Sequence, residues 1–134
     1  MPKKKKLTAA EKRELLGINS KVLKKILKKK KSIMGFDLST TATGFYHLNL
    51  VDDDQSFGMV IKGGKEHINK RIVSILDAID KLLINNSNSI AIIEDYSFGL
   101  SGSSVAQLAE LGGCVRTTLL RSHIAYLTVA PQTL

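Results

Sequence analysis

From Ser32 onward the chain alternates short apolar runs with longer amphipathic stretches, and this order limits the possible folds more than any other feature of the sequence. Short runs bounded by turn residues are typical of strands, and a three-to-four-residue apolar spacing is typical of helices. The predicted strands are residues 32–38, 43–50, 56–62, 90–93 and 125–129, and the predicted helices are residues 65–85 and 103–122. This order predicts an α/β fold with a mixed five-stranded sheet, in which a three-stranded antiparallel meander is followed by parallel strands, with helices on both faces.

The first 31 residues have a different composition. They contain 13 Lys and Arg against two acids, a net charge of +11, whereas the other 103 residues carry −3. Thr8 and Ser20 are placed to cap two short helices, and the second would have an apolar stripe among its lysines. We therefore expect a lysine-rich helical extension over residues 1–31 and one domain over residues 32–134. The extension is either an arm that binds a polyanion or a solubilising tail.

Other features exclude several classes of protein. The chain has no apolar run of 18 residues and no signal-peptide pattern, so we expect a soluble intracellular protein without a membrane partner. A cytoplasmic location in a bacterial or phage-infected cell is the expectation, with a nuclear or viral-factory location left open. Cys114 is the single cysteine, so an internal disulfide is impossible.

Two predicted strands end in an acid. Asp37 ends the apolar run that begins at Ser32, and Glu94 ends the β-branched run 90–93. A carboxylate at the end of a buried strand is costly unless it is paired, hydrogen-bonded or bound to a metal. In a sheet of this order the two strands are neighbours, so the two carboxylates would repel each other unless a proton or cation lies between them. Oxygen ligands of this kind favour Mg²⁺ or Mn²⁺, and phosphate-ester hydrolysis uses such pairs to hold two metals.

The residues around these acids resemble the motifs of RuvC-type Holliday-junction resolvases, in particular those of phage-type members. Residues 35–44 (GFDLSTTATG) are similar to the first motif of that family, and residues 92–96 (IIEDY) are similar to the second. Residues 108–116 resemble the helix that follows, and residues 129–134 resemble the segment after the fifth strand. The resemblance covers residues 33–134 and rests on the ordered set of four motifs.

The resemblance implies an RNase H-like fold, a homodimer, and hydrolysis of branched DNA by an endonuclease with two Mg²⁺ or Mn²⁺ ions in each complete site. It carries catalytic and metal-binding roles to Asp37 and Glu94 only. The remaining acidic ligands of the family lie on a later helix that this sequence does not contain, so we expect a C-terminally truncated, poorly active or inactive form.

Other residues are candidate contacts to DNA. Ser39 and Thr40 follow the first acid, and Tyr96 follows the second at a position near the base-stacking aromatic residue of the family, although the register differs. Core packing is an equal alternative for Tyr96. The basic candidates in the extension are Lys24, Lys25, Lys28, Lys29, Lys30 and Lys31.

Two alternatives remain open at this point. The sequence Asp-x-x-Thr-Thr after a strand also occurs in actin, Hsp70 and sugar-kinase ATPases, which would make this chain half of a nucleotide-binding fold. A DNA-binding remnant of the resolvase fold without catalytic activity is the other alternative.

Overall fold

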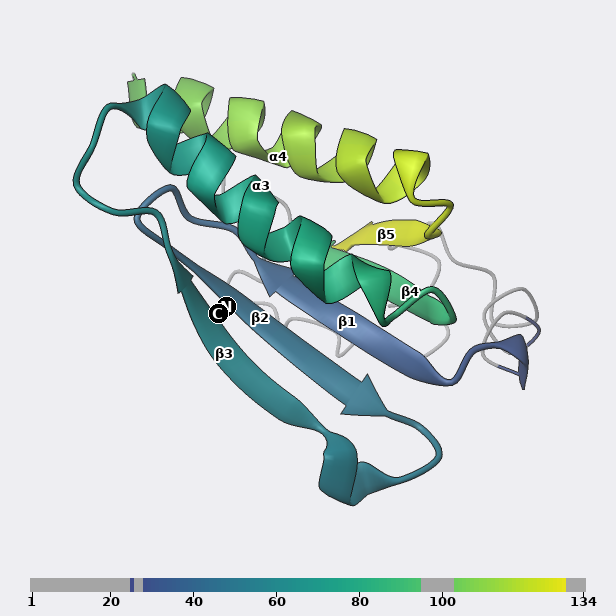
Figure 1. The fold of residues 1–134 in the computed structure, drawn as a ribbon. Coiled ribbons are helices and arrows are strands. Elements are labelled where there is room, and N and C mark those ends of the chain that lie inside the picture. The colour runs from purple at the N-terminus through teal and green to yellow at the C-terminus, as the bar shows by residue number, and fades with distance from the viewer. Residues whose placement is uncertain (1–24, 26–27, 95–102, 130–134) are drawn as a thin grey trace, which may run out of the picture.

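The computed structural model describes residues 25, 28–94 and 103–129, and their elements follow the predicted order (Figure 1). The strands are β1 (Ser32–Asp37), β2 (Ala42–Asn49), β3 (Phe57–Lys62), β4 (Ser89–Glu94) and β5 (Tyr126–Val129). The helices are α3 (Ile68–Ile84), α4 (Ser103–Arg121) and the short 3-10 helix η1 (Asp53–Gln55). Helix α3 begins three residues later than predicted because His67 caps it, its side chain accepting a hydrogen bond from the Asn69 backbone N–H.

The five strands form one sheet in the order β3-β2-β1-β4-β5. Strands β1, β2 and β3 pair antiparallel as a meander, and β4 pairs parallel with both β1 and β5. The predicted mixed sheet is therefore confirmed. Because β1 lies between β2 and β4, it is the central strand on which the candidate site is built.

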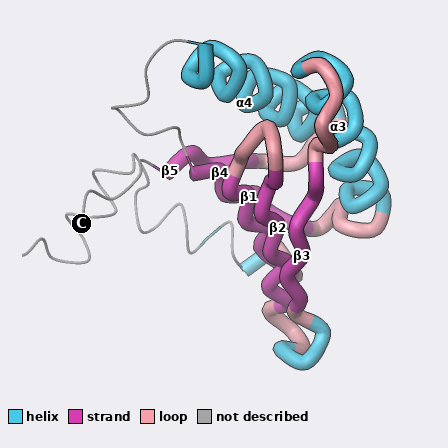
Figure 2. Tube along the Cα trace, turned by 90° about the vertical axis from the view of Figure 1, so that its left-hand side faces the viewer, coloured by secondary structure: helices cyan, strands magenta, loops and turns pink. Residues whose placement is uncertain are grey.

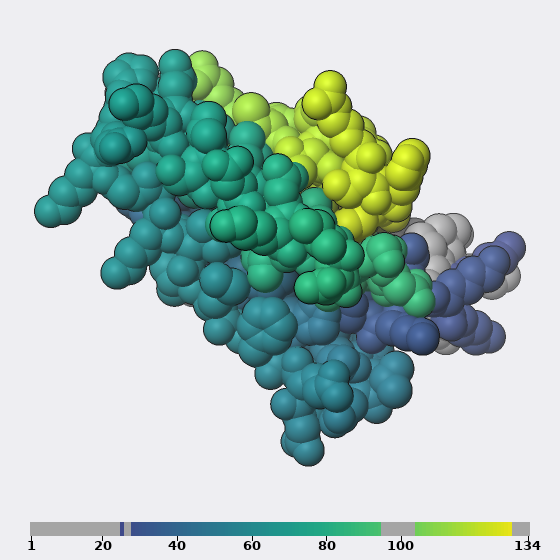
Figure 3. Space-filling view, in the orientation of Figure 1, coloured from purple at the N-terminus to yellow at the C-terminus, as the bar shows by residue number. Residues whose placement is uncertain are grey.

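Both long helices cover the same face of the sheet (Figure 2). Their buried side chains meet those of the strands in one core, in which Ile75 and Ile79 of α3, Leu111 and Val115 of α4, and Met34 of β1 are almost completely buried. Figure 3 shows this face closed over by helix side chains. The sequence predicted helices on both faces of the sheet. Within residues 28–94 and 103–129, both helices lie on one face.

The opposite face carries the alternate residues of each strand. Gly35 and Asp37 of β1 lie there, because their neighbours Met34 and Phe36 point into the core. Tyr46 is 51% exposed and Val60 is 60% exposed. In the described part of the chain, this face is open and largely apolar.

The helices among the described residues are too short or too polar to cross a membrane.

Candidate metal centre at the carboxyl edge of the sheet

Asp37 is the last residue of β1, and its side chain is exposed. The strand alternates buried and less buried residues, so Met34 and Phe36 turn toward the helices and Asp37 turns toward the open face. Gly44 lies opposite Asp37 on β2, where an added Cβ would lie 3.4 Å from the Asp37 Cβ. The absence of a side chain at Gly44 leaves the space beside the carboxylate open.

Glu94 occupies the matching position on the neighbouring strand. In the parallel ladder of β1 and β4, Phe36 lies opposite Ile93, and Asp37 and Glu94 are the next residues of the two strands. Both are exposed, and both turn away from the buried side chains that precede them. Neighbouring strands are about 4.8 Å apart, so the backbones place the two acids side by side on the same face.

The two acids line one hollow on the open face, with a volume of about 890 Å³. Its floor is formed by strands β1, β2, β3 and β4, and three of its residues are glycines. The residues that line it are Gly35, Phe36, Asp37, Gly44, Phe45, Tyr46, Gly58, Met59, Val60, Ile92, Glu94 and Val129. Because most of this lining is apolar, the carboxylates are the charged groups that a ligand would meet there.

A network of short-range hydrogen bonds holds the turn between β1 and β2. The buried Thr43 hydroxyl donates to the Ser39 carbonyl oxygen (2.7 Å), and the Ser39 N–H donates to the same hydroxyl (3.2 Å). The Ser39 hydroxyl accepts from the N–H groups of Thr41 (3.3 Å) and Ala42 (3.4 Å). The turn that follows Asp37 is therefore fixed by its own side chains.

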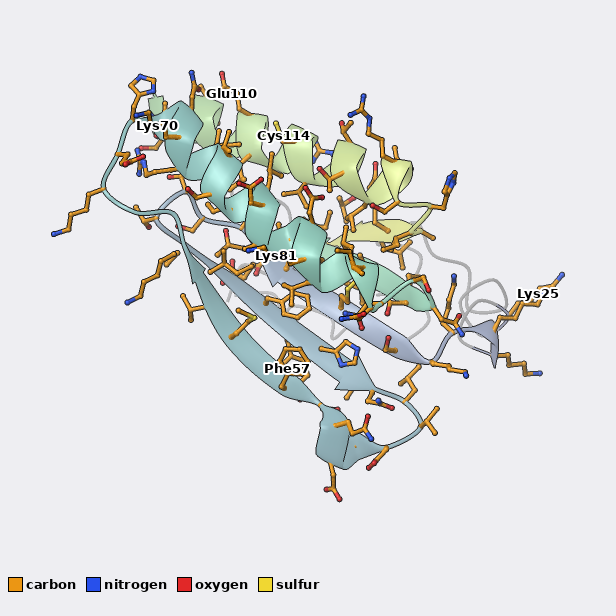
Figure 4. The ribbon with its side chains drawn as sticks, viewed as in Figure 1. Lys25, Phe57, Lys70, Lys81, Glu110 and Cys114 are labelled. Carbon is orange, nitrogen blue, oxygen red and sulfur yellow. The ribbon has the colours of Figure 1, made fainter. Side chains whose placement is uncertain are left out.

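The predicted DNA-binding residues fall in separate places. Ser39 and Thr40 lie next to Asp37, in the turn just described. Lys31 lies at the other end of β1, where its N–H donates to the Asn88 carbonyl and its carbonyl accepts from the Leu50 N–H. Figure 4 shows Lys25 at the far end of the molecule from Lys70 in the first turn of α3. A six-residue strand spans about 17 Å, so the extension is anchored well away from the acid pair. Lys24 and Tyr96 lie outside the described residues.

Sequence reasoning missed a second group of cations, which lies near the acids. Lys62 ends β3, and the loop that follows contains Lys65 and leads to Arg71 on the first turns of α3. Four basic residues and one acid lie within residues 62–71. This local excess of basic residues could have indicated a cationic surface. A lysine-flanked amphipathic helix is, however, equally typical of an ordinary solvated surface.

The donor set is suited to a hard divalent cation but is small. Two carboxylates on one face can hold Mg²⁺ or Mn²⁺, which prefer oxygen ligands. Within residues 28–94 and 103–129, no group of three or more His, Cys, Asp and Glu side chains is placed to hold a metal ion. A complete two-metal site would thus need further ligands from the substrate, water or other residues.

The architecture defines a class of protein: a central strand and its parallel neighbour, both ending in acids, in a mixed sheet ordered β3-β2-β1-β4-β5. This is the RNase H-like α/β fold. Among solved structures, the fold is similar to that of RuvC from Thermus thermophilus. In its complex with a Holliday junction substrate, RuvC matches with a TM-score of 0.66 and 15% identity over 75% of this chain and 64% of that chain.

Two further solved structures are similar. A second Thermus thermophilus RuvC structure matches with a TM-score of 0.63 and 15% identity, over 75% of this chain and 64% of that one. The yeast mitochondrial Holliday junction resolvase Ydc2 matches with a TM-score of 0.48 and 11% identity, over 90% and 64%. The chain therefore spans about two thirds of the length of the RuvC chains. No family model matches the sequence, and no curated protein matches it.

Proposed function

We propose that the chain is part of a metal-dependent endonuclease that hydrolyses phosphodiester bonds in branched DNA of the Holliday-junction kind. The observation that carries the proposal is the placement of Asp37 and Glu94 at the ends of two neighbouring parallel strands, on the same face and in the same hollow. The RuvC-like fold supports it, since the RuvC structure that matches with a TM-score of 0.66 is a complex with a Holliday junction substrate. A homodimer, which would give two paired incisions, belongs to the same proposal.

Asp37 and Glu94 would hold the cation, Mg²⁺ or Mn²⁺. When bound, such an ion activates water and neutralises charge on the phosphate. The protein itself contributes the positioning of the two acids. The Ser39–Thr43 hydrogen bonds fix the end of β1, and the parallel ladder fixes Glu94 relative to Asp37. The backbone positions of the two acids are thus fixed before substrate binds, which reduces the ordering entropy that is lost on binding.

A metal titration tests the proposal at the acid pair. We expect Asp37→Asn and Glu94→Gln each to lower the affinity for Mn²⁺ at least about tenfold, because each variant keeps its shape and loses a ligand charge. Asp80→Asn is the matched control, since Asp80 is an exposed acid on α3 outside the hollow. Isothermal titration or Mn²⁺ paramagnetic resonance gives the affinity. Equal affinities for Asp37→Asn and Asp80→Asn would contradict the proposed metal site.

Cleavage of a labelled four-way junction in Mg²⁺ or Mn²⁺ tests the reaction. We expect slow cleavage by the 134-residue chain and a further loss of roughly a hundredfold or more in Asp37→Asn, because electrostatic stabilisation of the developing charge depends on the bound ion. Cleavage that persists unchanged in Asp37→Asn would show that the reaction uses another site.

A DNA-binding role without catalysis is the second candidate. It is favoured by one observation, the absence of any third His, Cys, Asp or Glu beside the acid pair within the described ranges. Two-metal hydrolysis needs enough negative ligands to hold both cations against their mutual repulsion. Tight binding of the four-way junction with no cleavage in Mg²⁺ or Mn²⁺ would favour this candidate over the nuclease.

A further inference from the structure

The loop between β3 and α3 lies at the same edge of the sheet as the acid pair. Strand β2 is antiparallel to β1 and β3 is antiparallel to β2, so β3 runs in the direction of β1 (Figure 1). Lys62, the last residue of β3, therefore lies at the carboxyl edge of the sheet, as Asp37 does. The basic residues that follow Lys62 along the chain begin at this edge.

Lys62 also faces the same side of the sheet as Asp37. Along β3, Ile61 is buried in the core, and its neighbours Val60 and Lys62 turn to the open face. Val60 lies opposite Gly44, which lies opposite Asp37. Two strand spacings across and two residues along give about 12 Å between the backbones of Lys62 and Asp37, roughly the axial rise of three or four nucleotides.

The loop is joined rigidly to the turn after Asp37. The Gly63 N–H donates to the Thr41 carbonyl (2.9 Å), and a Cβ at Gly63 would lie only 2.4 Å from the Thr40 carbonyl oxygen. Gly64 has a φ of 84°, in the left-handed region that favours glycine. Because Gly63 allows this close approach and Gly64 the turn that follows, the backbone that carries these cations is held beside the turn after Asp37.

Arg71 packs against the same loop. A Cβ at Gly63 would lie 3.3 Å from the Arg71 Cβ, so the arginine lies directly behind the loop. Its Nε is buried and has no hydrogen-bond partner among the described residues. The positive charge of Arg71 therefore lies beside the loop, where it adds to the attraction of Lys62 and Lys65 for a phosphate group.

The neighbouring Lys70 differs from Arg71 because it lies beside an acidic residue. Lys70 and Glu66 line the same shallow hollow on the outer side of α3, together with Asn69, Val73 and Ser74. Glu66 precedes α3, so an acid and a base share this hollow at the start of the helix. The cations that flank Gly63 and Gly64 or pack against Gly63 are Lys62, Lys65 and Arg71, which we call the loop cations.

We propose that the loop cations bind the sugar-phosphate backbone of the DNA strand next to the one held at the acid pair. This inference rests on the proposed function. Asp37 and Glu94 repel a polyanion in the absence of a cation, and the loop cations offset this repulsion, beginning with Lys62 at about 12 Å from Asp37. The lysines of residues 25–31 cannot do so as directly, because they lie at the opposite end of β1.

The test is binding of a labelled four-way junction at several salt concentrations, without divalent metal, followed by fluorescence anisotropy. Each phosphate contact that is lost lowers the slope of log affinity against log salt by about 0.9. We expect the triple variant Lys62→Gln, Lys65→Gln and Arg71→Gln to lower the slope by about 2–3 and to weaken binding at least tenfold at low salt. Lys81→Gln is the matched control, since Lys81 is an exposed lysine in the last turn of α3.

Further readouts keep the outcomes distinct. Lys62→Gln alone removes one exposed charge from a strand end and should lower the slope by about 1 with unchanged circular dichroism, which removes misfolding as an explanation. Mn²⁺ affinity should be unchanged in all these variants. If the unmodified chain binds the junction but Lys62→Gln and the triple variant keep its slope, this inference is wrong and the proposed function stands. If the unmodified chain does not bind the junction, both are wrong.

Discussion

Gly63 is the residue at which the β3–α3 loop meets the turn after Asp37. A side chain there would overlap the Thr40 carbonyl oxygen, which lies 2.4 Å from the position of an added Cβ. That oxygen belongs to backbone and cannot move aside as the end of a flexible side chain could. The residue thus couples two loops that the sequence separates by more than twenty positions.

We expect Gly63→Ala to lower the free energy of unfolding by roughly 1–3 kcal/mol, since backbone must shift to relieve the overlap. Gly113→Ala is the control, because an added Cβ meets nothing within 4 Å on α4. In a helix interior this change should stabilise the protein by about 0.5–1 kcal/mol. Urea unfolding measures both. Equal effects of the two substitutions would contradict the close approach at Gly63.

Thr43 is the second residue whose side chain shapes the site. Its hydroxyl is completely buried and serves both the carbonyl and the N–H of Ser39. Thr43→Val removes both hydrogen bonds at nearly constant volume, so we expect a loss of roughly 1–3 kcal/mol and weaker Mn²⁺ binding. Thr43→Ser keeps the hydroxyl and should retain most of the Mn²⁺ affinity. Unaltered Mn²⁺ affinity in Thr43→Val would show that the turn does not position Asp37.

Helix α3 is the element that holds the meander and the parallel strands together. Its buried residues Ile72, Ile75, Ile79 and Leu83 repeat at helical spacing, and they pack against the sheet over the whole length of the helix. The opposite side of α3 carries exposed residues such as Val73 and Lys81. The amphipathic pattern therefore decides which side of the helix meets the sheet, as the sequence predicted.

We expect Ile79→Ala to lower the free energy of unfolding by about 2–5 kcal/mol, because Ile79 is fully buried and the smaller side chain leaves a cavity. Val73→Ala, on the same helix but 55% exposed, should change it by no more than about 0.5 kcal/mol. Thermal or urea unfolding compares the two. A loss in Val73→Ala as large as that in Ile79→Ala would mean that the outer side of α3 is also covered.

At the scale of the whole molecule, charge is divided between the two ends of the sheet. Lys31 and the described lysines just before it lie where β1 begins, and the acid pair and the loop cations lie where β1 ends. About 17 Å of strand separates the two ends. A DNA duplex that contacts both ends would therefore have to follow the molecule along β1.

Deletion of residues 1–29 tests whether the lysine-rich extension contributes to DNA binding. We expect weaker junction binding and a lower dependence of log affinity on log salt, since fewer counterions are released, together with an unchanged Mn²⁺ affinity. Anisotropy and metal titration on the same protein measure both. An unchanged salt dependence would identify residues 1–29 as a solubilising tail.

The sequence by itself determined the elements, their order and the acid-ended strands, because burial and hydrogen bonding impose a local period that short segments already show. Asp37 and Glu94 could be named from that pattern. The loop cations could not, since their closeness to Asp37 depends on strand direction and on the contact of Gly63 with Thr40, both of which join residues far apart in sequence. For the same reason, only the tertiary structure decided that both helices cover one face and that Lys25 and Lys31 lie far from the acids. Periodicity shows that a surface is buried, but not which surface covers it.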